Sequence, residues 1–181
     1  MRGHVRVEPW TSDWDAQFRE IRAMLADALG PLALAIEHVG STSVAGLAAK
    51  PILDIDVVIS SRDDLPAVVE RLAGIGFRHI GDGDIPGREV FKRTFEDAFM
   101  AYHLYVCARD SEELARHLAF RGWLRAHPED RDAYGRLKAA LAAAHPRDIE
   151  AYMAGKHEWI RATLARIEAE GSGADGGAGG R

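Results

Sequence analysis

Apolar residues recur along the chain with two periods, and each period predicts its own kind of element. A stripe with helical spacing follows Ser12-Asp13 and ends at Gly30-Pro31, which predicts a helix between them. Two continuous apolar runs, residues 32–39 (LALAIEHV) and 52–59 (ILDIDVVI), are rich in branched side chains and predict strands.

The middle of the chain predicts short strands, and the last third predicts helices. Strands are expected at residues 5–7 and near Phe77, a helix at 64–73, and a hairpin of residues 88–95 with 99–107. Helices follow Ser111 and are interrupted at His127-Pro128 and His145-Pro146. This order predicts an α+β fold, with a mixed β-sheet, flanking helices and a C-terminal helical region.

One domain is expected over residues 1–170, because a chain of 181 residues with 47% hydrophobic positions can bury a single core. Residues 171–181 contain six of the 18 glycines and no large apolar side chain. Such a segment cannot offset its ordering entropy by burial, so it is expected to be a flexible tail.

Charge and composition limit the kinds of partner that the protein is expected to bind. The formal net charge of -5 disfavours general affinity for a polyanion, so no nucleic-acid partner is expected. No apolar run reaches the roughly 18 residues of a membrane span, and no membrane partner is expected. With Cys107 as the single cysteine, an intrachain disulfide is impossible, and a cytoplasmic location is expected.

Two acids interrupt the most apolar strand. Asp54 and Asp56 are two positions apart, so both carboxylates leave one face with Cα atoms about 6.5 Å apart. Two like charges on a buried strand repel each other, and a divalent metal, Mg²⁺ or Mn²⁺, would neutralise them. The alternative is a pair of acids bonded to arginines at a sheet edge.

A loop of small residues precedes this strand. Gly40, Ser41 and Thr42 offer close backbone approach, hydroxyls and amides suited to phosphate oxygens. The alternative is an ordinary polar turn, and the spacing is not that of a Walker loop. Loop and aspartates together suggest a nucleoside triphosphate, or another phosphorylated small molecule, held beside a metal.

The order of these motifs resembles the polymerase-β-like nucleotidyltransferase superfamily and, within it, the GrpB family. The resemblance covers residues 5 to about 160, and it rests on VEPWTSDWDAQF, IEHVGSTSVAGLAAKPILDIDVVI, GREVFKR, YHLYV, LAFRGWLRAHP, YGRLKAAL and YMAGKHEWI. It implies the nucleotidyltransferase fold and, in some relatives, fusion to dephospho-CoA kinase. Two departures are Tyr105, where the family usually has a second histidine, and Gly122, where it usually has an aspartate.

Active relatives in the superfamily generally take a third carboxylate from a later strand, and residues 99–107 contain none. His103 is then the residue best placed to approach the aspartates as a metal ligand, with Glu37 and Glu89 as fallback acids. The alternative is a neutral histidine bonded within the sheet.

Several cations match family motifs and are candidates for phosphate binding. Arg88 and Lys92 share a strand face, and Arg121 and Arg125 are one helical turn apart. Three lysines complete the set: Lys50, Lys138 and Lys156. For each one alone, a solvated surface charge or a local salt bridge is the alternative.

The leading hypothesis is a metal-dependent nucleotidyltransferase in which Asp54 and Asp56 hold the metal and are catalytic, with the acceptor left open. The alternative is a noncatalytic module that binds a nucleotide or phosphometabolite, with a link to coenzyme A metabolism suggested by the family's fusions.

Overall fold

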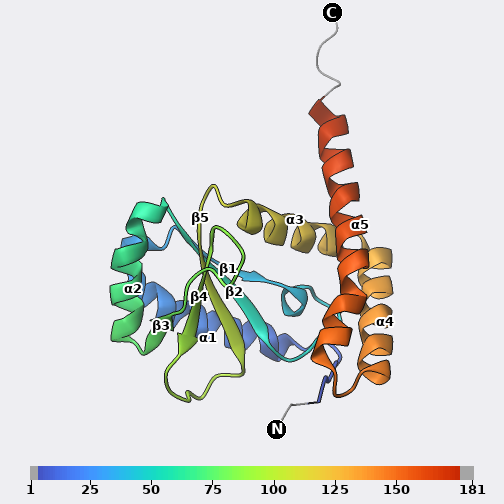
Figure 1. The fold of residues 1–181 in the computed structure, drawn as a ribbon, viewed down its shortest axis with the longest axis horizontal. Coiled ribbons are helices and arrows are strands. Elements are labelled where there is room, and N and C mark those ends of the chain that lie inside the picture. Colours follow the sequence, from blue (N-terminus) through green and yellow to red (C-terminus); the bar gives the residue numbers. More distant parts are fainter. Residues whose placement is uncertain (1–3, 176–181) are drawn as a thin grey trace, which may run out of the picture.

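The structure, a computed structural model, describes residues 4–175 and contains a five-stranded sheet with helices on both faces (Figure 1). The strands are β1 (Ala35–Val39), β2 (Leu53–Ile59), β3 (Phe77–His79), β4 (Arg88–Arg93) and β5 (Tyr102–Ala108). They lie in the order β1-β2-β5-β4-β3; β2 and β5 run parallel and the other pairs antiparallel. The predicted mixed sheet and the hairpin of β4 with β5 are confirmed.

Helices α1 (Ser12–Leu29) and α2 (Leu65–Gly74) cover one face of the sheet and form the main core with it. The residues of β2 that face these helices are all fully or almost fully buried: Leu53, Ile55, Val57 and Ile59. Side chains alternate between the faces of a strand, so the same burial fixes the direction of Asp54 and Asp56. Both point to the opposite face.

Helix α3 (Glu112–Ala126) lies on that opposite face. Its Leu114 packs with Val58 of β2 and Cys107 of β5. Burial raises the pKa of the Cys107 thiol to about 12, which keeps the thiol protonated in the core.

Helices α4 (Pro128–Ala144) and α5 (Ile149–Asp175) lie side by side beyond α3 and form a second apolar cluster with it (Figure 1). Val44 and Leu47, from the loop between β1 and β2, are buried in this cluster. The C-terminal helices therefore hold the loop that leads into β2.

Two boundaries differ from the sequence expectation. Helix α5 continues through Gly171 to Asp175, because each residue added to an existing helix gains a backbone hydrogen bond even where glycine lowers the propensity. The rest of the expected tail, 176–181, lies outside the described residues. Residues 5–7 form no strand; the segment makes an isolated bridge between Glu8 and Ala49.

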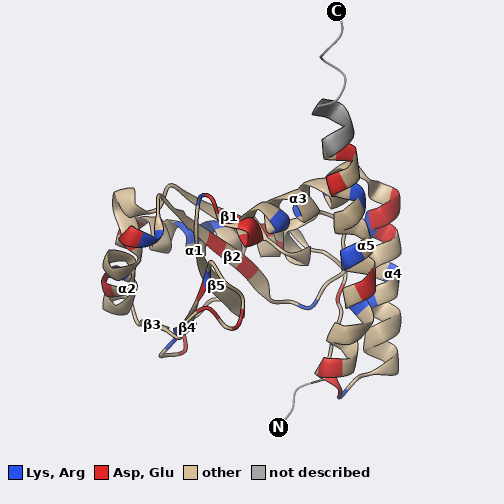
Figure 2. Ribbon diagram, turned by 45° about the horizontal axis from the view of Figure 1, so that its top comes forward, with Lys and Arg blue, Asp and Glu red and all other residues tan. Residues whose placement is uncertain are grey.

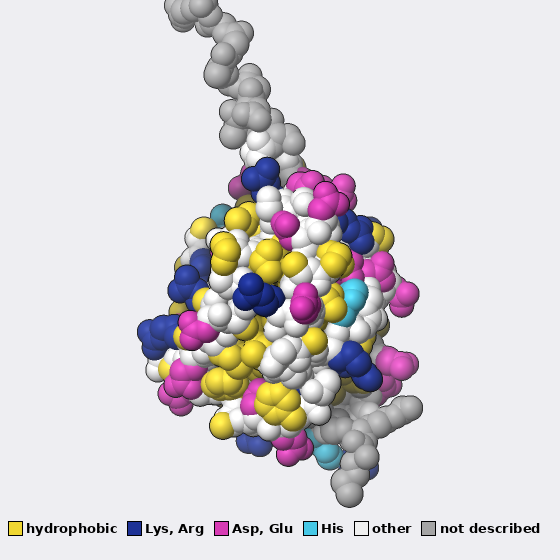
Figure 3. Space-filling model, turned by 90° about the vertical axis from the view of Figure 1, so that its left-hand side faces the viewer, with side chains coloured by type: hydrophobic (Ala, Val, Ile, Leu, Met, Phe, Trp, Pro, Cys, Tyr) yellow, Lys and Arg dark blue, Asp and Glu magenta, His cyan; other side chains and the backbone are white. Residues whose placement is uncertain are grey.

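Charged residues of both signs are spread over the helices, and β2 is marked by acidic positions (Figure 2). On the face shown in Figure 3, hydrophobic side chains are interspersed with charged ones. Across the described residues, no helix is long and apolar enough to cross a membrane.

Two helical glycines give a matched test of packing between α4 and α5. A Cβ at Gly155 would lie 2.4 Å from Leu141 Cδ2, whereas a Cβ at Gly122 of α3 would meet nothing within 4 Å. We expect Gly155→Val to lower the free energy of unfolding by about 1–3 kcal/mol through overpacking. Gly122→Ala should raise it by about 0.5–1 kcal/mol through helix propensity. Urea denaturation measures both, and a neutral Gly155→Val would show that α5 is loosely packed.

Candidate functional site

A cleft of about 1100 Å³ lies between the polar face of the sheet and α5, and Asp54 lines it. The loop after β1, the segment before β4, α3 and α5 supply the other walls. Asp56, two residues further along β2, is fully buried behind Asp54. The strand therefore presents one carboxylate to the cleft and one beneath its floor.

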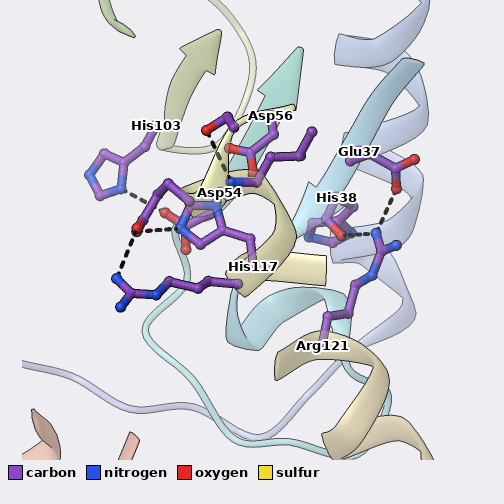
Figure 4. A network of polar contacts seen from close by, with 11 residues as sticks. Glu37, His38, Asp54, Asp56, His103, His117 and Arg121 are labelled. Carbon is purple, nitrogen blue, oxygen red and sulfur yellow. Dashed lines mark hydrogen bonds and ion pairs between the residues drawn. The ribbon is translucent and has the colours of Figure 1, made fainter. Parts of the chain in front are cut away.

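Each aspartate has its own histidine. His103 Nδ1 of β5 lies 2.9 Å from Asp54 Oδ1, as strand alternation predicts, because the two residues are register partners. His117 Nδ1 of α3 lies 2.6 Å from Asp56 Oδ2, and its Nε2 lies 3.3 Å from Glu113 Oε1. Figure 4 shows both rings turned toward the aspartate pair. The site thus contains two carboxylate–imidazole pairs.

The surroundings of His117 determine the direction in which its pKa shifts. Burial disfavours the imidazolium, but the hydrogen bond to Asp56 and the negative charges of Asp56 and Glu113 outweigh it and raise the pKa of His117. Asp56 Oδ1 is buried and has no hydrogen-bond partner within the described residues. An unpaired oxygen on a buried carboxylate is costly, so this atom has capacity for a further ligand.

The side chains around Asp54 and Asp56 meet some of the requirements of a binding site for a hard divalent cation. No three or more His, Cys, Asp or Glu side chains of the described residues are arranged to hold a metal. Mg²⁺ is commonly bound by one or two carboxylates, with water and substrate phosphates completing the shell. Asp54 lines the cleft, and Asp56 has one oxygen without a partner within the described residues, so the two residues supply the kind of oxygen donor that such a cation prefers. His103 Nδ1 is directed at Asp54. The role of His103 as a metal ligand stays a prediction.

The fallback acids do not complete a metal set. Glu37 is the register partner of Asp56 on β1, but its carboxylate accepts a hydrogen bond from Arg121 at 2.7 Å. Glu89 bonds to His79 and Arg62. Tyr105 is the register partner of Asp56 on β5, and burial and the charge of Asp54 raise its pKa to about 12. A neutral phenol therefore occupies the β5 position opposite Asp56.

The loop after β1 lies directly against Asp54. Gly40 has φ +69°, and a Cβ there would lie 2.2 Å from Asp54 Oδ2. Ser41 lines the cleft, whereas Thr42 is buried, with its hydroxyl 2.9 Å from His38 Nε2. Burial lowers the pKa of His38 to about 4, so this contact involves a neutral ring. The structure therefore places Gly40 and Ser41 at the cleft and turns Thr42 away from it.

Two of the seven candidate cations line the cleft. Arg88 stacks over the Tyr105 ring at 4.5 Å, and its buried Nε has no partner within the described residues. Lys156 of α5 lies 4.8 Å from the Tyr152 ring centre. These two cations face the same space as Asp54.

The other candidate cations lie elsewhere. Lys92 is exposed on β4 outside the cleft lining. Arg121 donates to Glu37 and His38 of β1, and Arg125 donates to Ser43 in the loop that follows; neither arginine lines the cleft. Lys50 and Lys138 do not line the cleft, and their ammonium groups lie over the rings of Tyr152 and Tyr134. The sequence correctly predicts that Arg121 and Arg125 share a helical face. In the structure, both side chains donate hydrogen bonds to other residues of the chain.

Sequence reasoning missed three residues of α3 that line the cleft: Glu113, Arg116 and His117. Glu113 and His117 are four residues apart and therefore share a helical face, which is a readable signal. Nothing in the sequence shows that this face meets Asp56, because that contact joins residues 61 positions apart.

Solved structures with low sequence identity share this fold. A complex of Cid1 with its short product ApU matches with a TM-score of 0.52 at 12% identity, over 73% of this chain and 42% of that one. The GLD-2/RNP-8 complex matches with a TM-score of 0.53 at 14% identity, over 88% and 57%. The fold is that of the polymerase-β-like nucleotidyltransferases.

Closer matches identify the family. The GrpB protein family matches residues 4–166, and the crystal structure of conserved protein GrpB from Enterococcus faecalis has a TM-score of 0.81 at 33% identity, covering 91% of this chain and 98% of that one. A UPF0157 protein of Halalkalibacterium halodurans is 37% identical over 161 residues, 88% of this chain and 78% of the relative. The chain belongs to the GrpB family.

Some relatives are longer than this chain. It is 34% identical to the UPF0157 protein YqkA of Bacillus subtilis over 157 residues, but spans 45% of that protein. It is 28% identical to a dephospho-CoA kinase of Mycolicibacterium paratuberculosis over 190 residues and spans 46% of it. The chain thus corresponds to under half of these two relatives.

Gly40 and Gly46 provide a matched test of the contact with Asp54. Both have positive φ, but a Cβ at Gly46 would lie no closer than 3.4 Å to Arg131, whereas one at Gly40 would collide with the carboxylate. We expect both alanine variants to lose about 1 kcal/mol of unfolding free energy from backbone strain, and Gly40→Ala to lose about 1–3 kcal/mol more. Equal losses in urea denaturation would contradict close contact between the loop and Asp54.

Proposed function

We propose that this protein binds a nucleoside triphosphate together with a divalent metal in the cleft and transfers the nucleotidyl group to an acceptor. The observation that carries the proposal is the aspartate pair of β2: Asp54 lines the cleft against the Gly40 loop, and Asp56 has one buried oxygen without a hydrogen-bond partner in the described part of the chain. Such a pair beside cationic side chains suits the charge of a metal-bound triphosphate.

The chain's own residues would divide the work of holding the substrate. Asp54 and Asp56 would hold the metal, which when bound supplies charge neutralisation at the α-phosphate. Gly40 allows the backbone to approach closely, and Arg88 and Lys156 face the cleft with positive charge. Transfer forms a bond from an acceptor oxygen to the α-phosphorus and breaks the bond to the β-phosphate. Pyrophosphate leaves, and the acceptor proton passes to water.

Three lysines would add positive charge near the α5 wall: Lys156 lines the cleft, and Lys50 and Lys138 interact electrostatically with Lys156. Burial lowers the pKa of Lys138 to about 7, helped by the charge of Lys156. Burial and Lys50 lower the pKa of Lys156 to about 8, against the opposing effect of Asp54. Lys138 Nζ is buried without a hydrogen-bond partner within the described residues. Buried cations without a paired carboxylate are expected to favour an anionic ligand.

Nucleotidyl transfer is tested with α-labelled nucleoside triphosphates, Mg²⁺ or Mn²⁺ and a pool of small metabolites. We expect labelled product and pyrophosphate, and a loss of about 100-fold for Asp54→Asn, because the variant removes a metal-binding charge. Asp63→Asn, at an exposed position of another turn, is the control. Full turnover by Asp54→Asn would rule out this mechanism.

Because of these lysines, we expect both the stability of the free protein and its nucleotide affinity to depend on pH. The unfolded chain keeps Lys138 protonated to about pH 10, so it binds more protons than the folded one above pH 7, and the stability of the free protein should rise with pH in that window. A bound phosphate favours the ammonium form, so nucleotide affinity should fall as pH rises through 7 to 8.

Lys138→Met isolates this contribution. We expect it to stabilise the free protein by about 1–3 kcal/mol at pH 6 while weakening nucleotide binding, because it removes a buried cation. Lys92→Met, at an exposed position outside the cleft lining, should change neither quantity. Thermal unfolding and calorimetry between pH 6 and 9 measure both, and unchanged binding by Lys138→Met would exclude the lysine from the phosphate site.

A second candidate function is a noncatalytic module that binds a nucleotide or phosphometabolite. The observation that favours it is the neutral Tyr105 on β5, in the position next to Asp56. This function predicts stabilisation by ligand without turnover, about 2.7 kcal/mol at a ligand concentration of 100 Kd. The relatives named dephospho-CoA kinase make coenzyme A precursors the first phosphometabolites to test.

A further inference from the structure

Helix α3 carries a polar stripe that connects the aspartates to the loop after β1. Its members follow at four-residue spacing and therefore lie along one helical face: Glu113, His117, Arg121 and Arg125. Successive members contact successive parts of the site, beginning with the contact of His117 with Asp56. The stripe is therefore a candidate for setting the geometry between strand and loop.

Arg121 fixes the end of β1. Its Nη1 donates to Glu37 Oε2 at 2.7 Å and to the carbonyl oxygen of His38 at 2.8 Å (Figure 4). Glu37 lies opposite Asp56 in the register of β1 with β2. By holding the Glu37 carboxylate, Arg121 keeps a third negative charge from turning toward the aspartate pair.

Arg125 fixes the loop itself. Its Nε and Nη2 both donate to the carbonyl oxygen of Ser43, at 3.2 and 2.7 Å. The Ser43 hydroxyl in turn donates to the carbonyl oxygen of Gly40 at 2.6 Å. A guanidinium can present two donors to one acceptor in a fixed plane, which a lysine cannot. The position of Gly40 against Asp54 thus connects to α3 through one side chain.

Two further donors reach neighbouring carbonyls. Trp10 Nε1 donates to the Thr42 oxygen at 3.2 Å, and Arg131 Nη1 of α4 donates to the Ala45 oxygen at 3.4 Å. A loop whose carbonyls are bonded from three sides has little freedom to shift. A Cβ-sized gap does not exist between Gly40 and Asp54, so even a small shift of the loop would change the space at the carboxylate.

We propose that Arg121 and Arg125 are positioning residues, which hold the Gly40–Ser41 backbone against Asp54 and so set the geometry of the phosphate and metal site. The expected effect on ligand binding rests on the proposed function. The positioning of the loop rests only on the contacts that α3 makes. Arg121 acts through the end of β1 and Arg125 through the loop that follows, and neither arginine lines the cleft.

The test compares Arg125→Gln, Arg125→Lys and Arg121→Lys with the control Arg136→Gln, at an exposed position of α4. The first measurement is amide hydrogen exchange of the ligand-free protein. In Arg125→Gln we expect about tenfold faster exchange in residues 40–47 and unchanged exchange in β2 and β5, because charge-assisted bonds to the loop are lost.

The second measurement is calorimetric titration with ATP and Mn²⁺. We expect about tenfold weaker binding by Arg125→Gln and an intermediate loss for Arg125→Lys, because lysine restores a charged donor but not the fork. We also expect an intermediate loss for Arg121→Lys, whose two bonds come from Nη1 alone, and wild-type affinity for Arg136→Gln. The partial rescue by lysine separates positioning from a general loss of structure.

Wild-type exchange in residues 40–47 of Arg125→Gln would overturn the inference, and so would faster exchange throughout the sheet. Wild-type affinity combined with a mobile loop would show that the loop geometry does not serve the site. If the wild-type protein itself fails to bind ATP with Mn²⁺, the proposed function is refuted for that nucleotide, while the exchange experiment still decides whether Arg125 holds the loop.

Discussion

The burial of the Asp56 carboxylate is the constraint on which the rest of the site depends. A fully buried carboxylate requires a partner, and His117 of α3 supplies it at 2.6 Å. That contact, together with the packing of Leu114 on Val58 and Cys107, holds α3 across the polar face of the sheet. Once α3 is there, its next two turns place Arg121 and Arg125 over the end of β1 and the loop that follows. The cleft is the space left between this assembly and α5.

The cations of the protein then fall into two groups with different physical roles. Arg121 and Arg125 have their hydrogen-bonding capacity directed at carbonyls and a carboxylate of the chain, so they stabilise the shape of the site. Lys138 and Lys156 lie over aromatic rings, and Lys138 Nζ has no hydrogen-bond partner within the described residues, so in their protonated forms these lysines can attract an anion. Arginines and lysines that count equally in the composition therefore have different roles: the two arginines stabilise the structure, and the two lysines can bind an anionic ligand.

The sequence allowed most of the elements to be predicted, because their signals are local. The alternation around Asp54 and Asp56 placed both acids on one face, and strand parity placed His103 beside Asp54. The strand expected at residues 5–7 failed because a strand needs a partner along its length, and here pairing occurs at Glu8 alone. The direction of Thr42 was also missed, since it depends on how the loop folds back so that the Thr42 hydroxyl is buried against His38.

The sequence by itself determined the kind of sheet, the family and the paired carboxylates, because periodicity, motif order and alternation are properties of neighbouring residues. Only the tertiary structure decided which charges meet. His117, which lies in none of the family motifs, is the partner of Asp56, while Arg121 bonds to β1 and Arg125 to the loop after it. The physical reason is that each of these contacts joins residues from different elements, so its existence depends on how α3 packs on the sheet and on the cost of leaving a buried charge unpaired.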